Sequence, residues 1–575
     1  MKRRFAAALV GGSLAGVTGW DLLQRRHTIL RNYPIVGHLR FLLEAVGPEL
    51  RQYIVTDNNA ERPFSRDQRR WVYTSSKLTN RYFGFGTDND LERVHNYPII
   101  KHAAFPVSAP DGEPNHPDPA VPLPAAKVLG GARGRAKAFR PSSLVNVSGM
   151  SFGALSGAAI TALNKGAAMA GALHTTGEGG VSPYHLNGGD LVWQIGTGYF
   201  GCCNDDGTFS LPRMVDRVAA TPSIRAVEIK LSQGAKPGLG GMLPGAKVTP
   251  EIAAIRGVPV GVDCKSPAGH SAFRDVDGLL ELVETIAAET GLPVGIKSAV
   301  GEGPFWLDLA ARMARTGRGV DFVTIDGGEG GTGAAPLVFS DHVALPFKWA
   351  FTRVYRAFAD QDLHRDVVFI GSGKLGIPEN ALLALAMGCD MINVARTAMF
   401  SIGCIQAQRC HTGRCPSGVA TQSPWLQHGL DPVLKSVRCA NYLATLRFKL
   451  LCLARACGYV HPALVPLDAI ELLDVDLKTR ASRRVVRIQA RLGHARPGRH
   501  RSNHDPHGGR NHAPPLTAHP QINRTASTVQ SPLAGAPESV AGYNMVGARV
   551  SIVRLRTMCS TTIRPKVWNG ASTNF

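Results

Sequence analysis

At 575 residues, 44% of them hydrophobic, the chain is long and apolar enough for one large domain with smaller attachments, which excludes a small binding module. Its formal net charge of +21 would suit a nucleic-acid partner, but residues 481–575 hold 14 basic and only two acidic residues, which leaves +9 for residues 1–480. The excess is largely a property of the tail, so we expect no specific nucleic-acid partner. Eleven cysteines, an odd number at irregular spacing, speak against a disulfide framework.

Residues 1–27 form a short apolar N-terminal segment. An uncharged run at residues 5–20 follows Met1-Lys-Arg-Arg, and its sixteen residues are fewer than the roughly 20 of a membrane span. Arg25 and Arg26 come after it, so the basic residues on both sides set no orientation. A cleaved signal peptide fits the pattern, but we favour a weak membrane anchor or a surface helix.

Residues 28–142 are interpreted as a lead-in and linker without visible chemistry. Residues 28–95 predict a helix followed by irregular chain, whereas residues 96–142 are rich in proline and end in the basic stretch Arg133-Gly-Arg-Ala-Lys. We expect this stretch to be a surface connection whose charges form a solvated face.

From residue 143 to residue 480, short apolar runs end in glycine-rich loops and alternate with helical patterns. This alternation predicts parallel strands joined by crossover helices. The clearest helices are expected at residues 156–170, 276–290 and 378–387. Eight candidate strands fit an α/β fold of the (β/α)8 TIM-barrel kind: residues 144–147, 172–175, 226–231, 258–263, 294–296, 322–325, 367–370 and 391–394.

The most distinctive sequence motifs follow these predicted strands, at the end of the barrel where such folds carry their chemistry. One glycine-rich loop is commonly just a tight turn, but several at one end indicate a ligand site. The loops after strands seven and eight form the usual phosphate site of this barrel, with backbone N–H groups pointing at the anion. The phosphate candidates are therefore Gly371, Ser372, Gly373, Arg396 and Thr397.

Residues 403–422 carry three cysteines, Cys404, Cys410 and Cys415, spaced C-x5-C-x4-C, with Pro416 after the last. A short loop can turn several thiolates toward one point, and proline often follows a ligand of an iron–sulfur cluster. Three ligands suit a three-iron cluster, or a four-iron cluster with one outside ligand. The alternative is three buried or free thiols in a reduced protein.

Five motifs together resemble the FMN-binding region of glutamate synthase: MSFGALS, TGEGG, QGAKPG-x-GG-x-LPG, DGGEGGTGAAP and the cysteine loop. They agree in order over about residues 100–480, and the loop matches CH-x3-CP-x-G-x-ATQ at Cys410, His411, Cys415, Pro416, Gly418, Ala420, Thr421 and Gln422. The family uses FMN and a three-iron cluster (3Fe-4S) to reduce 2-iminoglutarate, formed from 2-oxoglutarate and ammonia, to L-glutamate. The resemblance implies the same cofactors here, with Cys404, Cys410 and Cys415 as cluster ligands.

Several residues then gain expected roles. Lys297 could place positive charge near N1 of the flavin, and Gln233 could hydrogen-bond the ring; the alternative for Lys297 is a strand-end lysine held in an ion pair. Lys236 or Arg396 could pair with a substrate carboxylate or the phosphate. We take Lys297, Gln233 and Lys236 as catalytic candidates. The remaining cofactor candidates are Met150, Ser151, Gly153, Glu178, Asp326, Gly327 and Gly328.

The chain also departs from the family pattern. No glutaminase domain corresponds, and Leu239 stands where the family usually has a glutamate implicated in handling ammonia. An FMN-dependent transferase acting on glutamate or an amine, or an inactive redox relative, therefore remains an alternative to glutamate synthase activity. No dinucleotide-binding fingerprint stands out, so the resemblance implies a ferredoxin or a separate reductase subunit as electron donor and a cytoplasmic location.

Residues 481–575 form a low-complexity basic tail. Arginine, histidine, glycine and proline without apolar periodicity predict a disordered segment, because too little surface can be buried. It could be a basic arm for nucleic acid or anionic lipid, or the product of a shifted reading frame.

Overall fold

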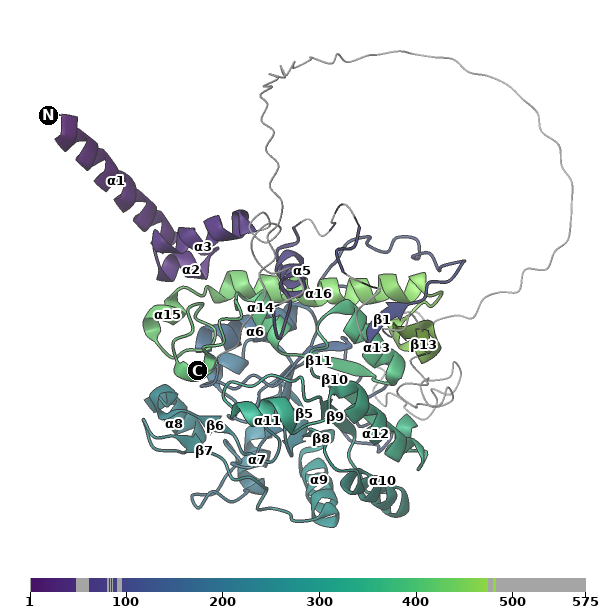
Figure 1. Ribbon diagram of the computed structural model, residues 1–575. Helices are drawn as coiled ribbons and strands as arrows, with labels where there is room; N and C mark the ends of the chain where they lie inside the picture. The colour runs from purple at the N-terminus through teal and green to yellow at the C-terminus, as the bar shows by residue number, and fades with distance from the viewer. Residues whose placement is uncertain are drawn as a thin grey trace, which may run out of the picture. The chain divides into compact units, whose positions relative to one another are not determined.

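The computed structural model describes residues 2–47, 61–79, 82, 84, 86–89, 91, 96–473 and 479–481 (Figure 1). All of them belong to the first of two units, Met1–Gly508, and the second unit, Gly509–Phe575, lies outside the described residues. The predicted tail, from residue 482 onward, lies outside them as well, and the predicted domain boundaries stay predictions.

Eight parallel strands close into a barrel at the centre of the described chain (Figure 1), which confirms the predicted (β/α)8 fold. The barrel closes because β10 pairs with both β11 and β9, and β11 pairs with β2, so the sheet has no free edge. The strands are β2 (Val145–Val147), β3 (His174–Thr175), β4 (Leu191–Ile195), β5 (Ile224–Lys230), β8 (Val294–Ser298), β9 (Phe322–Asp326), β10 (Val368–Ser372) and β11 (Met391–Val394).

One predicted strand is wrong and one real strand was missed. Residues 258–263 form a loop, since Gly261 has a left-handed φ of 74° and both Val260 and Val262 are 55% exposed. A strand of a parallel barrel is buried on both faces, and this segment is not. The missing strand is β4, which is buried along its whole length. Because one strand was wrongly predicted and one was missed, the fifth to eighth predicted strands are still the fifth to eighth strands of the barrel.

Helices surround the barrel, as Figure 1 shows. Two predicted helices have the predicted bounds, α9 and α13, and the predicted helix at 156–170 is α6, with Ser156 as its N-cap accepting a hydrogen bond from the Ala159 N–H at 3.1 Å. The barrel helices are α6 (Gly157–Met169), α7 (Leu211–Ala219), α8 (Pro250–Arg256), α9 (Val276–Thr290), α10 (Pro304–Thr316), α11 (Leu337–His342), α12 (Phe347–Ala359), α13 (Pro378–Met387), α14 (Arg396–Ser401), α15 (Pro424–His428) and α16 (Pro432–Ala456).

Two small antiparallel sheets lie outside the barrel. The first joins the linker to the end of the described chain and contains β1 (Tyr97–Ile100), β12 (Ile470–Leu473) and β13 (Thr479–Ala481). The second, β6 (Met242–Leu243) with β7 (Cys264–Lys265), holds together the long excursion between β5 and β8.

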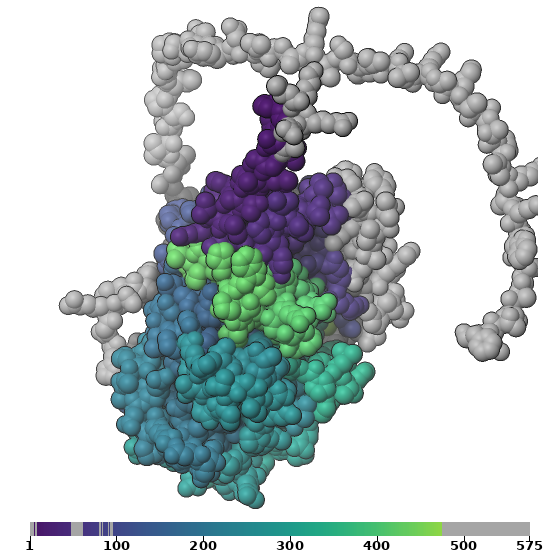
Figure 2. Space-filling view, turned by 90° about the vertical axis from the view of Figure 1, so that its left-hand side faces the viewer, coloured from purple at the N-terminus to yellow at the C-terminus, as the bar shows by residue number. Residues whose placement is uncertain are grey.

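The described chain ahead of the barrel forms four helices, of which the second and the last contact the cysteine-loop region. They are α1 (Lys2–Leu23), α2 (Thr28–Asn32), α3 (Val36–Ala45) and α5 (Arg66–Lys77). The side-chain amide of Asn32 donates to the carbonyl oxygen of Leu426 at 2.9 Å, and Figure 2 shows the purple N-terminal helices against the green segment that contains α15. Among the described residues, no helix combines the length and apolar character needed to cross a bilayer.

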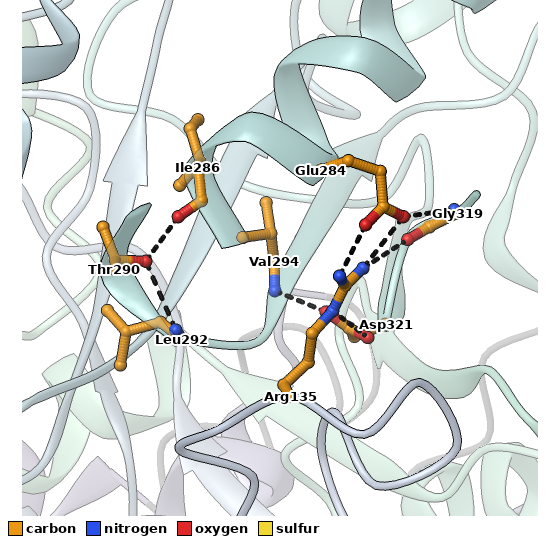
Figure 3. A network of polar contacts seen from close by, with 8 residues as sticks. All are labelled: Arg135, Glu284, Ile286, Thr290, Leu292, Val294, Gly319 and Asp321. Atoms are coloured by element: carbon orange, nitrogen blue, oxygen red, sulfur yellow. Dashed lines mark hydrogen bonds and ion pairs between the residues drawn. The ribbon is translucent and has the colours of Figure 1, made fainter. Parts of the chain in front are cut away.

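The linker closes the N-terminal end of the barrel, opposite the glycine-rich loops. Arg135 donates to Asp321 at 3.0 Å and to Glu284 at 2.6 Å, and Asp321, which directly precedes β9, accepts the Val294 N–H at 2.8 Å (Figure 3). The Arg135 side chain is only 10% exposed. The prediction of a solvated face is therefore wrong at this residue, because the basic stretch supplies the counter-charge for a buried carboxylate.

Candidate functional site

A buried polar cluster stands at the carboxyl end of β5. Lys230, the last residue of β5, donates from Nζ to Glu178 Oε1 at 2.8 Å and to Gln233 Oε1 at 2.6 Å. Burial favours the neutral acid, but the charges of Lys230 and Lys236 outweigh it, so the pKa of Glu178 lies below its usual value. Glu178 is therefore ionised, and Gln233 can still donate from its amide nitrogen.

Lys236 belongs to the same cluster and is 4% exposed. Burial lowers the pKa of Lys236 to about 8, although Glu178 pulls it upward. The ammonium group is thus mostly protonated at neutral pH and loses its proton only slightly above it. Such a group can hold an anionic ligand or exchange a proton with it.

Lys297 lies within β8 and faces the end of β9. Its Nζ is 3.6 Å from Asp326 Oδ2, and Asp326 also accepts hydrogen bonds from the Gly234 N–H at 2.9 Å and from the Ser372 hydroxyl at 2.8 Å. Burial opposes the charged form, but Asp326 and then Glu228 raise the pKa of Lys297. This contact matches the alternative of a strand-end lysine in an ion pair, while the role toward a flavin stays a prediction.

Two cations gather where the loops after β10 and β11 meet. The Arg396 guanidinium lies 5.0 Å from the centre of the Phe64 ring, and the Lys374 ammonium lies 5.2 Å from the same centre. Burial lowers the pKa of both side chains, and Arg396 lowers that of Lys374 further. The charge of Glu329 acts in the opposite direction and raises the pKa of both. Two neighbouring, partly buried cations suit a phosphate group.

The remaining phosphate candidates lie around these cations. Gly371 and Ser372 end β10, and Gly373 follows with a left-handed φ of 122°. A Cβ on Gly373 would lie 3.1 Å from the backbone nitrogen of Gly327, so this position needs glycine for two reasons. Thr397, in the first turn of α14, lies against Gly376.

Several predicted cofactor residues pack against protein. A Cβ on Gly327 would lie 2.6 Å from the Phe347 Cβ, and one on Gly328 would lie 2.6 Å from the carbonyl oxygen of Ala344. A Cβ on Gly153 would likewise approach the Leu243 side chain, and a Cβ on Gly177 would approach Ser151. The carbonyl oxygen of Met150 accepts a hydrogen bond from His185 Nε2 at 2.9 Å. The small size of these glycines therefore serves loop packing, and contact with a cofactor remains a prediction for this group.

The three cysteines of the loop lie close enough to act on one another. Burial, and then the neighbouring Cys415 and Cys410, raise the pKa of the Cys404 thiol to about 12. Burial and Cys415 also raise the pKa of Cys410, against the lowering effect of Lys247. Within the described ranges, no three or more histidine, cysteine and acidic side chains are gathered tightly enough to hold one metal ion.

Lys247 joins the cysteine loop to the loop that follows β2. It is 2% exposed, and its Nζ donates to the carbonyl oxygens of Ala154 at 2.6 Å and of Cys410 at 3.3 Å. Gln422 forms a second link, since its amide donates to the carbonyl oxygens of Gly153 at 3.0 Å and of Leu155 at 2.8 Å. The cysteine loop is thereby fixed directly beside the barrel mouth.

Sequence reasoning missed Lys230, Lys247 and Lys374. A signal for Lys230 was present, because a lysine that ends an apolar strand of a barrel points to the site at that end. Lys374 directly follows the phosphate candidate Gly373, which was a signal for it. Lys247 had no signal, since its contact joins positions 163 residues apart.

Comparisons with known proteins agree on a family. A family model described as a conserved region in glutamate synthase matches residues 132–460. The glutamate synthase large subunit-like protein YerD of Bacillus subtilis is 38% identical over 471 residues, which cover 77% of this chain and 89% of that protein. The archaeal glutamate synthase (NADPH) of Methanocaldococcus jannaschii is 36% identical over 306 residues, 52% of this chain and 56% of its own length.

The chain thus spans most of the Bacillus relative but about half the length of the archaeal one. Among solved structures, a mandelate oxidase variant is 14% identical with a TM-score of 0.34, covering 72% of this chain and 89% of that chain, a likeness too weak to carry an argument. The family match includes the barrel strands, the polar cluster and the cysteine loop. The chain belongs to the glutamate synthase family of oxidoreductases, as its five motifs predicted.

Proposed function

We propose that the chain is a glutamate synthase-type enzyme that uses FMN and a three-iron cluster to reduce 2-iminoglutarate to L-glutamate. The observation that carries this proposal is the double hydrogen bond of Lys247, which fixes the cysteine loop against the loop after β2 at the barrel mouth. An electron carrier on the cysteine loop would then lie next to a redox group held at the strand ends. Family membership supports the same reaction.

The residues at the strand ends fit FMN. Lys374 and Arg396 would hold its phosphate, because they are neighbouring, partly buried cations on the loops after β10 and β11. Lys297 would lie near the ring, with Asp326 holding its side chain in place. When bound, FMN would supply the hydride that reduces the imine carbon.

Lys236 and Gln233 would hold the substrate. Lys236 is buried, largely protonated at neutral pH and able to pair with a carboxylate of a 2-oxoglutarate or glutamate-type ligand. Lys230 holds the Gln233 carbonyl oxygen, which turns its amide N–H groups toward another acceptor. Glu178, kept ionised by Lys230, sets the charge of the cluster so that one cation remains for the substrate.

The thiolates of Cys404, Cys410 and Cys415 would hold the cluster. An iron–sulfur cluster spreads its ligands over a larger volume than one metal ion does, so a wide group of three thiols on one loop suits it. The buried Lys247 cation beside Cys410 favours the thiolate form that a cluster needs. Electrons would come singly from a ferredoxin or a separate reductase subunit, and we propose the cytoplasm as the location for this reason.

A second candidate is an FMN-dependent transferase acting on glutamate or an amine. Leu239 favours it, because this residue is 38% exposed in the loop after β5 and can neither accept a proton nor hold an ammonium ion. Release of a methyl- or aminoacyl-glutamate product would point to this reaction.

The test starts with anaerobic purification of the wild-type chain and of Cys410→Ser. We expect a flavin absorption spectrum in both and a cluster signal in electron paramagnetic resonance that only the wild type shows. Ammonia-dependent oxidation of a reduced donor with 2-oxoglutarate, yielding glutamate, would support the proposal. Flavin without a cluster signal would favour the transferase, and absence of both cofactors would point to an inactive relative.

A further inference from the structure

A group of basic side chains gathers where α2 meets the first turns of α16. Burial, and then the charges of Lys77, Arg438, Lys435 and Arg26, lower the pKa of His27 to about 4. All four cations therefore lie within electrostatic reach of one imidazole ring. These residues come from three parts of the chain that are far apart in sequence, and Figure 2 shows the purple and green segments in contact.

Lys435 is the buried centre of this group. It is 2% exposed, and the one hydrogen bond of its Nζ within the described part of the chain goes to the carbonyl oxygen of Arg26 at 3.4 Å. Arg438 donates to the same carbonyl at 3.2 Å. An ammonium group has three donors, so Lys435 has two more to offer. A buried charge without partners is costly.

A second polar atom without a partner among the described residues lies near Lys435. The hydroxyl of Thr28, a residue that is 4% exposed, has no hydrogen-bond partner among the described residues. A Cβ placed on Gly403 would lie 3.4 Å from Lys435 Nζ and 3.8 Å from Thr28 Oγ1. The ammonium and the hydroxyl thus flank the same side of Gly403, the residue before Cys404.

The nearby carboxylates are already engaged. Asp431 accepts the Val433 N–H at 3.0 Å as the N-cap of α16 and lies 3.7 Å from Arg25. Glu44 is bound to Arg40 at 2.6 Å. Burial, and then Arg438 and Lys77, lower the pKa of Lys435 to about 7 despite Asp431, which agrees with a shortage of negative charge.

We propose that a small oxyanion of the phosphate class binds between α2 and α16, held by Lys435, Thr28 and Arg438. Because Lys435 is almost completely buried, only a small ion can reach it, which excludes the surface of a partner protein. The ammonium, hydroxyl and guanidinium groups of these residues can all donate hydrogen bonds, which suits the several acceptor oxygens of an oxyanion. The bound ion joins the N-terminal helices to the barrel beside the cysteine loop, and the proposal is independent of the flavin and the cluster.

The experiment is a calorimetric titration of the full-length protein with inorganic phosphate at pH 7, with potassium chloride keeping the ionic strength constant. We expect one saturable site in the wild type. Lys435→Met keeps an unbranched side chain of similar length but removes the ammonium group, and should weaken phosphate binding about tenfold or more. Thr28→Val removes only the hydroxyl and should weaken binding severalfold. Lys137→Met, an exposed lysine in the linker, should change nothing.

Circular dichroism checks that each variant is folded. If Lys435→Met does not fold, Thr28→Val still tests the proposal. The proposal is overturned if the wild type shows no saturable phosphate heat, or if Lys435→Met and Thr28→Val both bind phosphate like the wild type. If the heat of phosphate binding is lost in Lys374→Met but kept in Lys435→Met, the ion binds at Lys374 and Arg396 instead. That result would also overturn the proposal.

Discussion

The ammonium group of Lys247 donates a hydrogen bond to the backbone carbonyl oxygen of Cys410 at 3.3 Å. The same group is held by Ala154 at 2.6 Å, so one buried side chain links the cysteine loop with the barrel mouth. Burial lowers the pKa of Lys247 to about 8, whereas Cys410 and Cys415 raise it. In return, the cation lowers the pKa of Cys410.

Replacing Lys247 with methionine should make Cys410 less reactive in protein freed of any cluster. The thiolate is the nucleophile, and loss of the cation raises the pKa of Cys410, so alkylation by iodoacetamide at pH 8 should slow roughly two- to tenfold. Mass spectrometry of the labelled Cys410 peptide gives the rate. Lys137→Met is the control, and an unchanged rate in Lys247→Met would show that Lys247 does not act on this thiol.

Arg135 should contribute strongly to stability. Arg135→Met removes the ion pair of the buried Asp321 carboxylate and leaves it only the charge of Arg133 nearby, and breaking a buried pair costs about 3–5 kcal/mol of the free energy of unfolding. Urea unfolding measures the loss. Arg140→Met, an exposed arginine in the same linker, should cost less than about 0.5 kcal/mol. Asp321→Asn should recover part of the loss in the double variant; a loss below about 1 kcal/mol in Arg135→Met would contradict this role.

The fold was largely predictable because its signals are local. The bounds of α9 follow from Asp275, which caps its start by accepting the Gly278 N–H at 2.8 Å, and from Gly291 in the left-handed conformation at its end. The strand at 258–263 was a wrong prediction because alternating valines at 258, 260 and 262 look like a strand while Gly257 and Gly261 both have positive φ. β4 was overlooked because its five residues stand between glycine-rich loops.

The candidate site was predictable only in part, because sequence motifs identify the loops but not which side chains of different loops contact each other. That Gln233 and Lys236 lie near Glu178 follows from barrel topology, since strand ends meet at one face. That Lys230 holds both Glu178 and Gln233 requires side-chain geometry. The role of Arg135 could not be predicted for a similar reason, because a short basic run looks the same in sequence whether its charges face water or form ion pairs with carboxylates.

Lys236 should make stability depend on pH. Its pKa is lowered from 10.5 to about 8 in the folded protein. Between these values the unfolded chain binds more protons, so the free energy of unfolding rises with pH. Relative to that of Lys236→Met, the free energy of unfolding of the wild type should increase by up to roughly 2 kcal/mol between pH 7 and pH 9.5. Urea unfolding of both proteins at the two pH values measures the gain; a constant difference would mean that Lys236 keeps an ordinary pKa.

Leu239 should determine whether ammonia is used as the nitrogen donor. It is 38% exposed, so Leu239→Glu should change the free energy of unfolding by only about 0.5 kcal/mol or less. A carboxylate at this position can hold an ammonium ion near the polar cluster, and we expect ammonia-dependent glutamate formation to rise severalfold. The readout is the initial rate with a reduced donor and 2-oxoglutarate at increasing ammonia. Leu239→Gln, of similar size but uncharged, is the matched control and should not gain activity. Equal rates in the two variants would show that the charge at this position does not govern the use of ammonia.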